Sequence, residues 1–201
     1  METAAYWVAL LAVVGSPPFL LMWFIIHPFT TTWRRLGAAK TYLVLLLVVA
    51  AGVVVLYILH RPLLRIHFGV RVPLVVIAAV LFVAGLFLGV QRLARLTPAA
   101  MLGLPEVSPK GYPGRLITEG IYAHLRHPRY VEVGLGLAAM ALFTNYLAMY
   151  VLSVAYVPLI YLVVLLEERE LRARFGEQYE QYSRQVPRFL PRLFPRKKTS
   201  P

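Results

Sequence analysis

The sequence predicts an all-α integral membrane protein with about five transmembrane helices and an amphipathic cytoplasmic helix near its C-terminus. Hydrophobic residues make up 59% of the 201 residues and charged residues only 15%, whereas soluble domains have about 45–50% and about 25%. Several apolar runs approach the ~20 residues needed to cross a hydrocarbon core about 30 Å thick. The Lys and Arg residues lie mainly between and after these runs. A chain of this length fits one membrane domain over residues 1–201.

Five apolar segments are expected to span the membrane. They lie at about residues 4–26, 42–59, 72–90, 130–143 and 147–166. The first contains Pro17 and Pro18, where we expect a kink because proline removes a backbone donor and clashes with the preceding turn. The fourth is short and contains Glu132, which we expect to pair with Arg126 or Arg129 or to reach toward the interface.

The link between the last two spans, Thr144-Asn145-Tyr146, is so short that it predicts an antiparallel hairpin. The segments that flank this hairpin must then lie on one face of the membrane. They carry most of the 21 Lys and Arg residues, which marks this face as cytoplasmic by the positive-inside rule. With five spans, the N-terminus is expected on the outside.

Two segments outside the spans are expected to cover the cytoplasmic face. The connection at residues 96–120 is rich in Pro and Gly and is too long for a plain turn. After residue 166, five apolar residues recur at helical spacing and share one face: Leu171, Phe175, Tyr179, Tyr182 and Val186. We expect one amphipathic helix that ends before Pro187, and a lid formed by this helix and the connection.

The composition excludes several kinds of site. The chain has no cysteine, so it has no disulfide, no thiolate nucleophile and no cysteine-ligated metal, and we expect no metal site. The formal net charge of +12 suits membrane lipids with anionic headgroups better than nucleic acid, because the basic residues flank apolar runs. Three histidines, His27, His60 and His67, lie at span ends or in the outer loop and are expected to be interfacial.

Two polar clusters are candidates for chemistry, because polar groups at membrane depth are costly. One contains Arg126 and His127, just before the fourth span, and the other is Glu167-Glu168, where the fifth span ends. The hairpin brings both clusters to the same face, where they would hold a small zwitterion. Arg126 or His127 would meet its carboxylate, and Glu167 or Glu168 would meet its ammonium or hydroxyl groups. The alternative interpretation is that both clusters are interfacial anchors and surface ion pairs.

Three stretches, each at the end of an apolar span or just after one, form a recognisable pattern. They are residues 116–122, then Arg126-His127-Pro128-Arg129-Tyr130, then Glu167-Glu168 followed by Leu171, Phe175-Gly176, Tyr179, Tyr182 and Val186-Pro187. With this pattern, residues 116–191 resemble the superfamily of isoprenylcysteine carboxyl methyltransferases and phospholipid methyltransferases, which are integral membrane enzymes. The order and the context of the stretches make the resemblance specific, since a short motif alone is weak.

The resemblance implies S-adenosylmethionine as the cofactor and a cofactor-binding part at about residues 114–191. It implies a pocket lined by Leu116, Ile117, Tyr122, His127, Pro128 and Tyr130, and closed by Glu167 or Glu168 from the other arm of the hairpin. We add Arg126 to the cofactor-binding set for its charge, and Glu167 and Glu168 are also the catalytic candidates. The expected acceptor is a lipophilic small molecule or lipid, such as an isoprenylcysteine-type carboxylate or a lipid amine, at the cytoplasmic face.

Two other functions fit the same architecture. Membrane sterol reductases have a similar Arg-His-x-x-Tyr segment and tail but use NADPH, whose phosphates ask for several cations where this chain has Glu167-Glu168. The third possibility is a non-catalytic membrane scaffold that retains the fold. Titration with both cofactors would separate the three.

Overall fold

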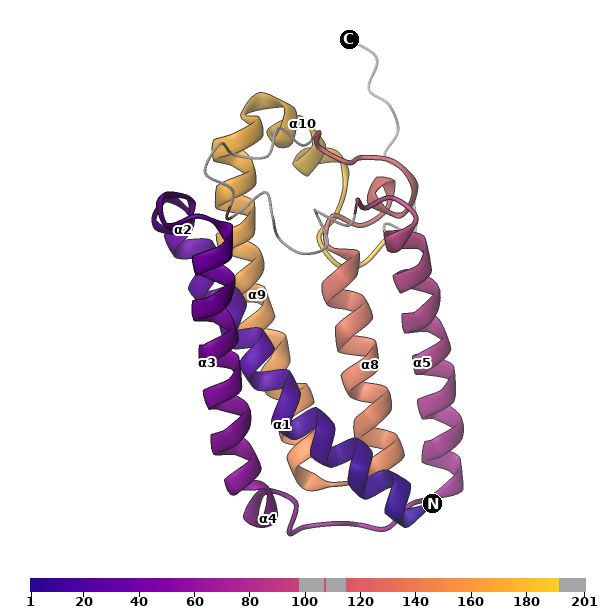
Figure 1. Cartoon of the computed structure of the whole chain (residues 1–201). Coiled ribbons are helices and arrows are strands. Elements are labelled where there is room, and N and C mark those ends of the chain that lie inside the picture. Colours follow the sequence, from indigo (N-terminus) through magenta and orange to yellow (C-terminus); the bar gives the residue numbers. More distant parts are fainter. Residues whose placement is uncertain (98–106, 108–114, 192–201) are drawn as a thin grey trace.

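The computed structural model describes residues 1–97, 107 and 115–191. Five long helices lie side by side: α1 (Glu2–Ile26), α3 (Ala38–Ile58), α5 (Val72–Leu93), α8 (Pro128–Thr144) and α9 (Leu147–Phe175) (Figure 1). Short helices connect or follow them: η1 (His27–Phe29), α2 (Thr30–Leu36), α4 (His60–Leu63), η2 (Gly120–Ala123) and α10 (Glu177–Gln185). The predicted all-α class is therefore confirmed. Most of the predicted lid connection lies outside the described residues.

The bundle exposes its apolar side chains, as a membrane protein must. Four helical segments are long and apolar enough to cross a bilayer, namely residues 2–36, 38–58, 72–93 and 147–175. Large apolar residues on α3 and α5 stay exposed, with Leu46 at 63% and Phe87 at 61%. The expected fourth span, α8, has 17 residues, which is at the lower limit of about 17–25 for a spanning helix. These features make the chain a multi-pass membrane protein.

Helices α8 and α9 form the antiparallel hairpin that their short link predicts (Figure 1). Asn145 ends α8 in the left-handed conformation, at φ 54°. Its side-chain amide donates to the carbonyl of Gly69 at 2.7 Å, and its side-chain oxygen accepts from the Tyr150 hydroxyl at 2.8 Å. The turn is thus fixed against the loop that precedes α5.

Glycines on α5 let α8 approach closely. A Cβ atom on Gly89 would lie 2.7 Å from a carboxylate oxygen of Glu132, and one on Gly85 would lie 3.4 Å from the Glu132 carbonyl. Glu132 pairs with Arg92 of α5, whose Nε lies 2.8 Å from Oε2. The expected pairing of Glu132 with Arg126 or Arg129 is therefore wrong, because the partner comes from a neighbouring helix and not from the preceding turn.

The C-terminal region differs from the single amphipathic helix that we predicted after residue 166. Helix α9 continues to Phe175, since nothing in its sequence breaks it at the acidic pair, and the chain then turns at Gly176, which has φ 51°. Helix α10 follows and ends at Gln185, before Pro187 as expected. The five predicted apolar residues still pack in one cluster. The break at Gly176 folds α10 back over the end of the bundle (Figure 1).

Candidate functional site

A polar cavity of about 340 Å³ lies where the N-terminus of α8 meets the C-terminal part of α9 and α10. Eight of the nine residues predicted to bind a cofactor line it: Leu116, Ile117, Tyr122, Arg126, His127, Pro128, Tyr130 and Glu167. The ninth, Glu168, is not on its wall. The structure thus brings together stretches that are separated by about forty residues in the sequence, while their role in binding a cofactor stays a prediction.

Glu167 presents its carboxylate to the cavity. Its side chain is 29% exposed, and its Oε2 accepts a hydrogen bond of 2.7 Å from the Tyr130 hydroxyl. The same oxygen lies 3.4 Å from Nδ1 of His127. These contacts hold the carboxylate in place and leave part of it accessible to a ligand in the cavity.

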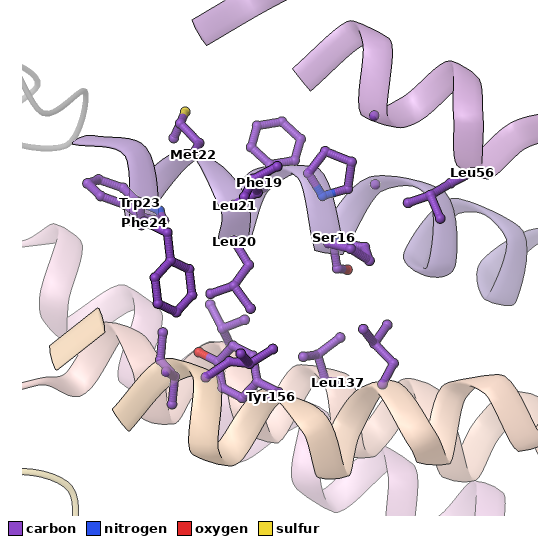
Figure 2. Close-up of a pocket in the computed structure, with 18 of the residues that line it drawn as sticks. Ser16, Phe19, Leu20, Leu21, Met22, Trp23, Phe24, Leu56, Leu137 and Tyr156 are labelled. Carbon is purple, nitrogen blue, oxygen red and sulfur yellow. The ribbon is translucent and has the colours of Figure 1, made fainter. Parts of the chain in front are cut away.

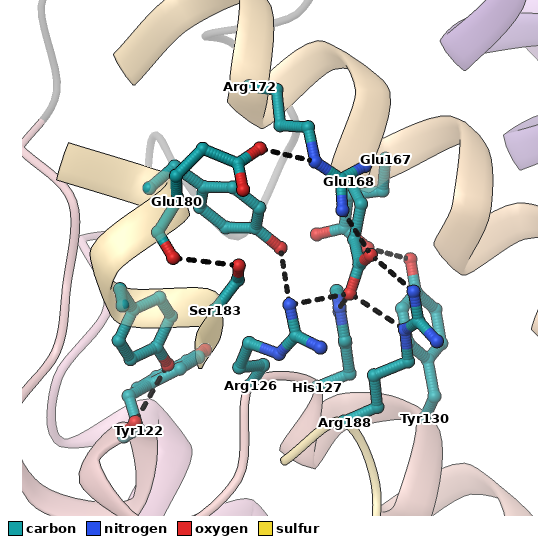
Figure 3. Close-up of polar contacts among 12 residues, drawn as sticks. Tyr122, Arg126, His127, Tyr130, Glu167, Glu168, Arg172, Glu180, Ser183 and Arg188 are labelled. Atoms are coloured by element: carbon teal, nitrogen blue, oxygen red, sulfur yellow. Dashed lines mark hydrogen bonds and ion pairs between the residues drawn. The ribbon is translucent and has the colours of Figure 1, made fainter. Parts of the chain in front are cut away.

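Glu168 is fully buried behind this wall and joins several cations (Figure 3). Its carboxylate lies 3.0 Å from Nη1 of Arg126, 2.8 Å from Nη2 of Arg188 and 3.2 Å from Nη2 of Arg172. Nε2 of His127 lies 3.3 Å away. A buried carboxylate requires such compensation, because desolvation of an unpaired charge costs several kcal/mol. Glu168 therefore fixes the positions of Arg126 and His127.

His127 connects the two carboxylates. One ring nitrogen faces Glu167 and the other faces Glu168, and only a protonated ring can donate to both. Burial alone would lower the pKa of His127, but the charges and hydrogen bonds of Glu167 and Glu168 outweigh burial and raise it. This geometry favours the imidazolium form.

The segment after α10 returns across the start of α8 as a strap. The backbone N–H groups of Arg126 and His127 donate to the carbonyls of Pro187 and Arg188, at 2.9 and 3.1 Å. Phe189 then packs near the His127 ring, with ring centroids 6.2 Å apart. These bonds satisfy backbone donors near the N-terminus of α8 that have no partner within the helix. Sequence reasoning missed the strap and the role of Arg188.

Tyrosines close the side of the cavity next to α10. The Tyr182 hydroxyl donates to the carbonyl of Tyr122 at 2.7 Å. The Tyr179 hydroxyl lies 3.5 Å from Nη1 of Arg126. Burial raises the pKa of Tyr122 to about 12.

The N-terminal half also contributes to this cavity, which no motif in the sequence indicated. Trp23 and His27 both line it, and their rings stack with centroids 5.4 Å apart. His27 is only 7% exposed, and its Nδ1 lies 3.3 Å from Glu170 of α9. The end of α1 packs onto α9 and buries His27, a contact that the expected interfacial position did not indicate.

The cavity has the donors and acceptors that a zwitterion needs. Nε of Arg126 is buried without a hydrogen-bond partner among the described residues, and its side chain is only 8% exposed. The partly exposed Glu167 carboxylate stands on the opposite arm of the hairpin. A cation with an unsatisfied donor thus faces the same cavity as an accessible anion.

Comparison with known proteins assigns a family to this arrangement. The phospholipid methyltransferase family model matches residues 74–178, just over half of the chain. The chain is 35% identical over 77 residues to protein-S-isoprenylcysteine O-methyltransferase of Schizosaccharomyces pombe. The aligned residues cover 38% of this chain and 33% of the relative. It is 38% identical over 81 residues to methanethiol S-methyltransferase 2 of Bradyrhizobium diazoefficiens, covering 39% and 30%.

A third relative is named for a different property. The chain is 38% identical over 79 residues to cobalt-zinc-cadmium resistance protein CzcN of Cupriavidus metallidurans, which covers 39% of this chain and 36% of that protein. The chain thus spans about a third of the length of the curated relatives it matches. No solved structure matches this chain significantly.

Proposed function

Because the chain belongs to the phospholipid methyltransferase family, we propose that it transfers a methyl group from S-adenosylmethionine to a lipophilic acceptor. Two of its relatives are named as methyltransferases, one for an isoprenylcysteine and one for methanethiol. The observation that carries the proposal is that the buried cation Arg126 and the accessible carboxylate of Glu167 line the same cavity.

The residues of this cavity fit the cofactor chemically. Its volume of about 340 Å³ lies within the ~300–1,000 Å³ typical of small-molecule sites. The unsatisfied Nε of Arg126 suits the carboxylate of the methionine part, and Glu167 suits an amino or ribose hydroxyl group. When bound, S-adenosylmethionine supplies an electrophilic methyl group on a positively charged sulfur.

The two acidic residues have different parts in this proposal. Glu167 lines the cavity and acts on the ligand directly. Glu168 is a positioning residue, which holds Arg126 and His127 through contacts of 3.0 and 3.3 Å. The protein's work in a methyl displacement is to align donor and acceptor and to exclude water, so rigid positioning matters more than acid–base chemistry.

Titration of the purified protein with S-adenosylmethionine tests the proposal. We expect a dissociation constant in the micromolar range or below, which is about −8 kcal/mol at 1 μM. NADPH serves as the second ligand, because a sterol-type reductase would bind it instead. Saturable binding of NADPH alone, or of neither ligand by folded protein in lipid nanodiscs, would rule the proposal out.

We also propose that the polar cavity faces the cytoplasm, which follows from the basic residues that flank the hairpin. The native chain has no cysteine, so single cysteines report their side cleanly. Gln181→Cys on α10 should be protected from an impermeant thiol reagent in intact cells, whereas Arg65→Cys near α4 should be labelled. Both positions are exposed in the fold. The reverse labelling pattern would invert the topology.

A further inference from the structure

A second and larger cavity lies between α1, α3, α8 and α9 and is open on one side, where lining residues such as Leu11 and Phe19 are exposed. Its volume is about 1080 Å³, slightly above the ~300–1,000 Å³ typical of small-molecule sites. The wall is mostly aliphatic and aromatic, and Figure 2 shows Leu20 and Phe24 of α1 pointing toward the helix that carries Tyr156. The parts of the wall on α1 and α3 lie outside residues 74–178, the segment that matches the family.

Arg129 is the one charged side chain among the described residues that line this cavity. Its guanidinium lies over the Trp23 ring, 4.6 Å from the ring centroid. Within the described part of the chain it forms no ion pair with a carboxylate, in contrast to Arg126, which pairs with Glu168. A cation on an apolar wall is costly unless an anion compensates it.

The two cavities meet at three shared residues, Trp23, Arg129 and Tyr130. The Tyr130 hydroxyl donates to Glu167, which lines the polar cavity but not the apolar one. The junction thus has a cation beside the apolar cavity and a carboxylate beside the polar cavity. A methyl acceptor in the apolar cavity and a methyl donor in the polar cavity would meet at this junction.

The apolar cavity has the length of a lipid chain. It follows α1 from Leu11 to Ile26, which is about 22 Å of helix at 1.5 Å per residue. One leaflet of hydrocarbon is about 15 Å deep. A single extended chain therefore fits along the cavity with its polar end at Arg129.

We propose that this cavity holds a single-chain amphiphile whose nucleophile is an anion, a carboxylate or a thiolate, and that Arg129 selects this charge. The inference rests on the proposed methyl transfer. The acceptor anion forms a new bond to the methyl carbon, the bond from that carbon to the donor sulfur breaks, and the donor leaves as a neutral thioether. No proton moves. The negative charge of the acceptor and the positive charge of the donor sulfur both disappear in this step, so a site that excludes water favours it.

An amine acceptor fits this junction less well. A primary amine has a pKa of about 10, so it would arrive as an ammonium ion that Arg129 repels. It would also have to lose a proton before it could attack. The charge of Arg129 therefore discriminates between two acceptor classes with the same chain.

Photolabelling in lipid nanodiscs tests the site without any cofactor. The probes are a photoactivatable analogue of palmitate and the amine of the same chain length. We expect labelled peptides from residues 11–26 and 51–56, with the carboxylate labelling at least about ten times more strongly than the amine. Labelling elsewhere, or equal labelling by both probes, would overturn the proposal.

A matched pair of variants controls for the cavity itself. Gly15 lines the cavity, and a Cβ atom there would meet nothing within 4 Å. Gly15→Phe should obstruct the cavity and strongly reduce labelling by both probes, whereas Gly15→Ala should leave labelling unchanged. Unaltered S-adenosylmethionine affinity in Gly15→Phe would show that the protein is still folded. Undiminished labelling in Gly15→Phe would exclude this cavity as the acceptor site.

Variants of Arg129 test the selection. Arg129→Gln should reduce labelling and methylation of the carboxylate by about ten- to hundredfold and increase labelling by the amine, while Arg129→Lys should retain part of the preference. An unchanged preference in Arg129→Gln would refute the role of this residue. If S-adenosylmethionine fails to bind but labelling follows the expected pattern, the proposed function fails while the amphiphile site stands.

Discussion

Glu168→Gln is expected to destabilise the protein by about 3–5 kcal/mol, because it removes the charge that compensates a set of buried cations. The carboxylate is fully buried and contacts Arg126, Arg172, Arg188 and His127. A glutamine keeps the shape but offers a single neutral acceptor. The Arg126 side chain, only 8% exposed, would then be a buried cation without its counter-ion. The measurement is the thermal midpoint of unfolding in detergent, with tryptophan fluorescence as the signal.

Glu180→Gln is the matched control for this change. Glu180 also pairs with Arg172, at 2.9 Å, but its side chain is 38% exposed. An exposed ion pair contributes at most about 1 kcal/mol, so its removal should shift the midpoint little. Equal shifts in the two variants would show that Glu168 is an ordinary ion pair and not the centre of the cluster.

The hairpin and the residues at its open end could be predicted because local sequence determines them. A link of a few residues leaves two helices no arrangement other than an antiparallel one. Polar residues at the ends of those helices then face the same side, so His127 and Glu167 had to lie near each other. The stretch around Tyr122 joined them through the resemblance to a known superfamily.

The division of roles between Glu167 and Glu168 could not be predicted. Adjacent residues on a helix point about 100° apart, so one faces the cavity and the other faces the returning tail. Which residue faces the cavity depends on how α9 is rotated against α8. The partner on the other side, Arg188, reaches Glu168 only after the chain has turned at Gly176, and spacing does not encode this contact.

Contacts between distant helices were also beyond the sequence. His27 and Glu170 are 143 positions apart and meet because the end of α1 packs on α9. Arg92 reaches Glu132 across the α5–α8 contact, although Arg126 and Arg129 lie much closer to Glu132 in the sequence. Packing of nearly featureless apolar helices decides both pairs, and each helix offers several faces of similar hydrophobicity.

Glu167→Gln is expected to weaken S-adenosylmethionine binding by about ten- to 150-fold, the equivalent of a charged hydrogen bond worth ~1.5–3 kcal/mol. In the native protein the Tyr130 hydroxyl donates to the Glu167 carboxylate at 2.7 Å. The glutamine oxygen can still accept this hydrogen bond, so the fold should survive. The thermal midpoint should therefore fall much less than in Glu168→Gln.

Glu177→Gln, an exposed carboxylate on α10, controls for the loss of one negative charge and should bind as the native protein does. Titration calorimetry and the thermal midpoint are measured on all three variants. If Glu167→Gln and Glu177→Gln bind S-adenosylmethionine equally well, Glu167 does not contact the ligand. If Glu167→Gln instead loses stability as Glu168→Gln does, both carboxylates hold the fold and the cavity needs another anion for the ligand.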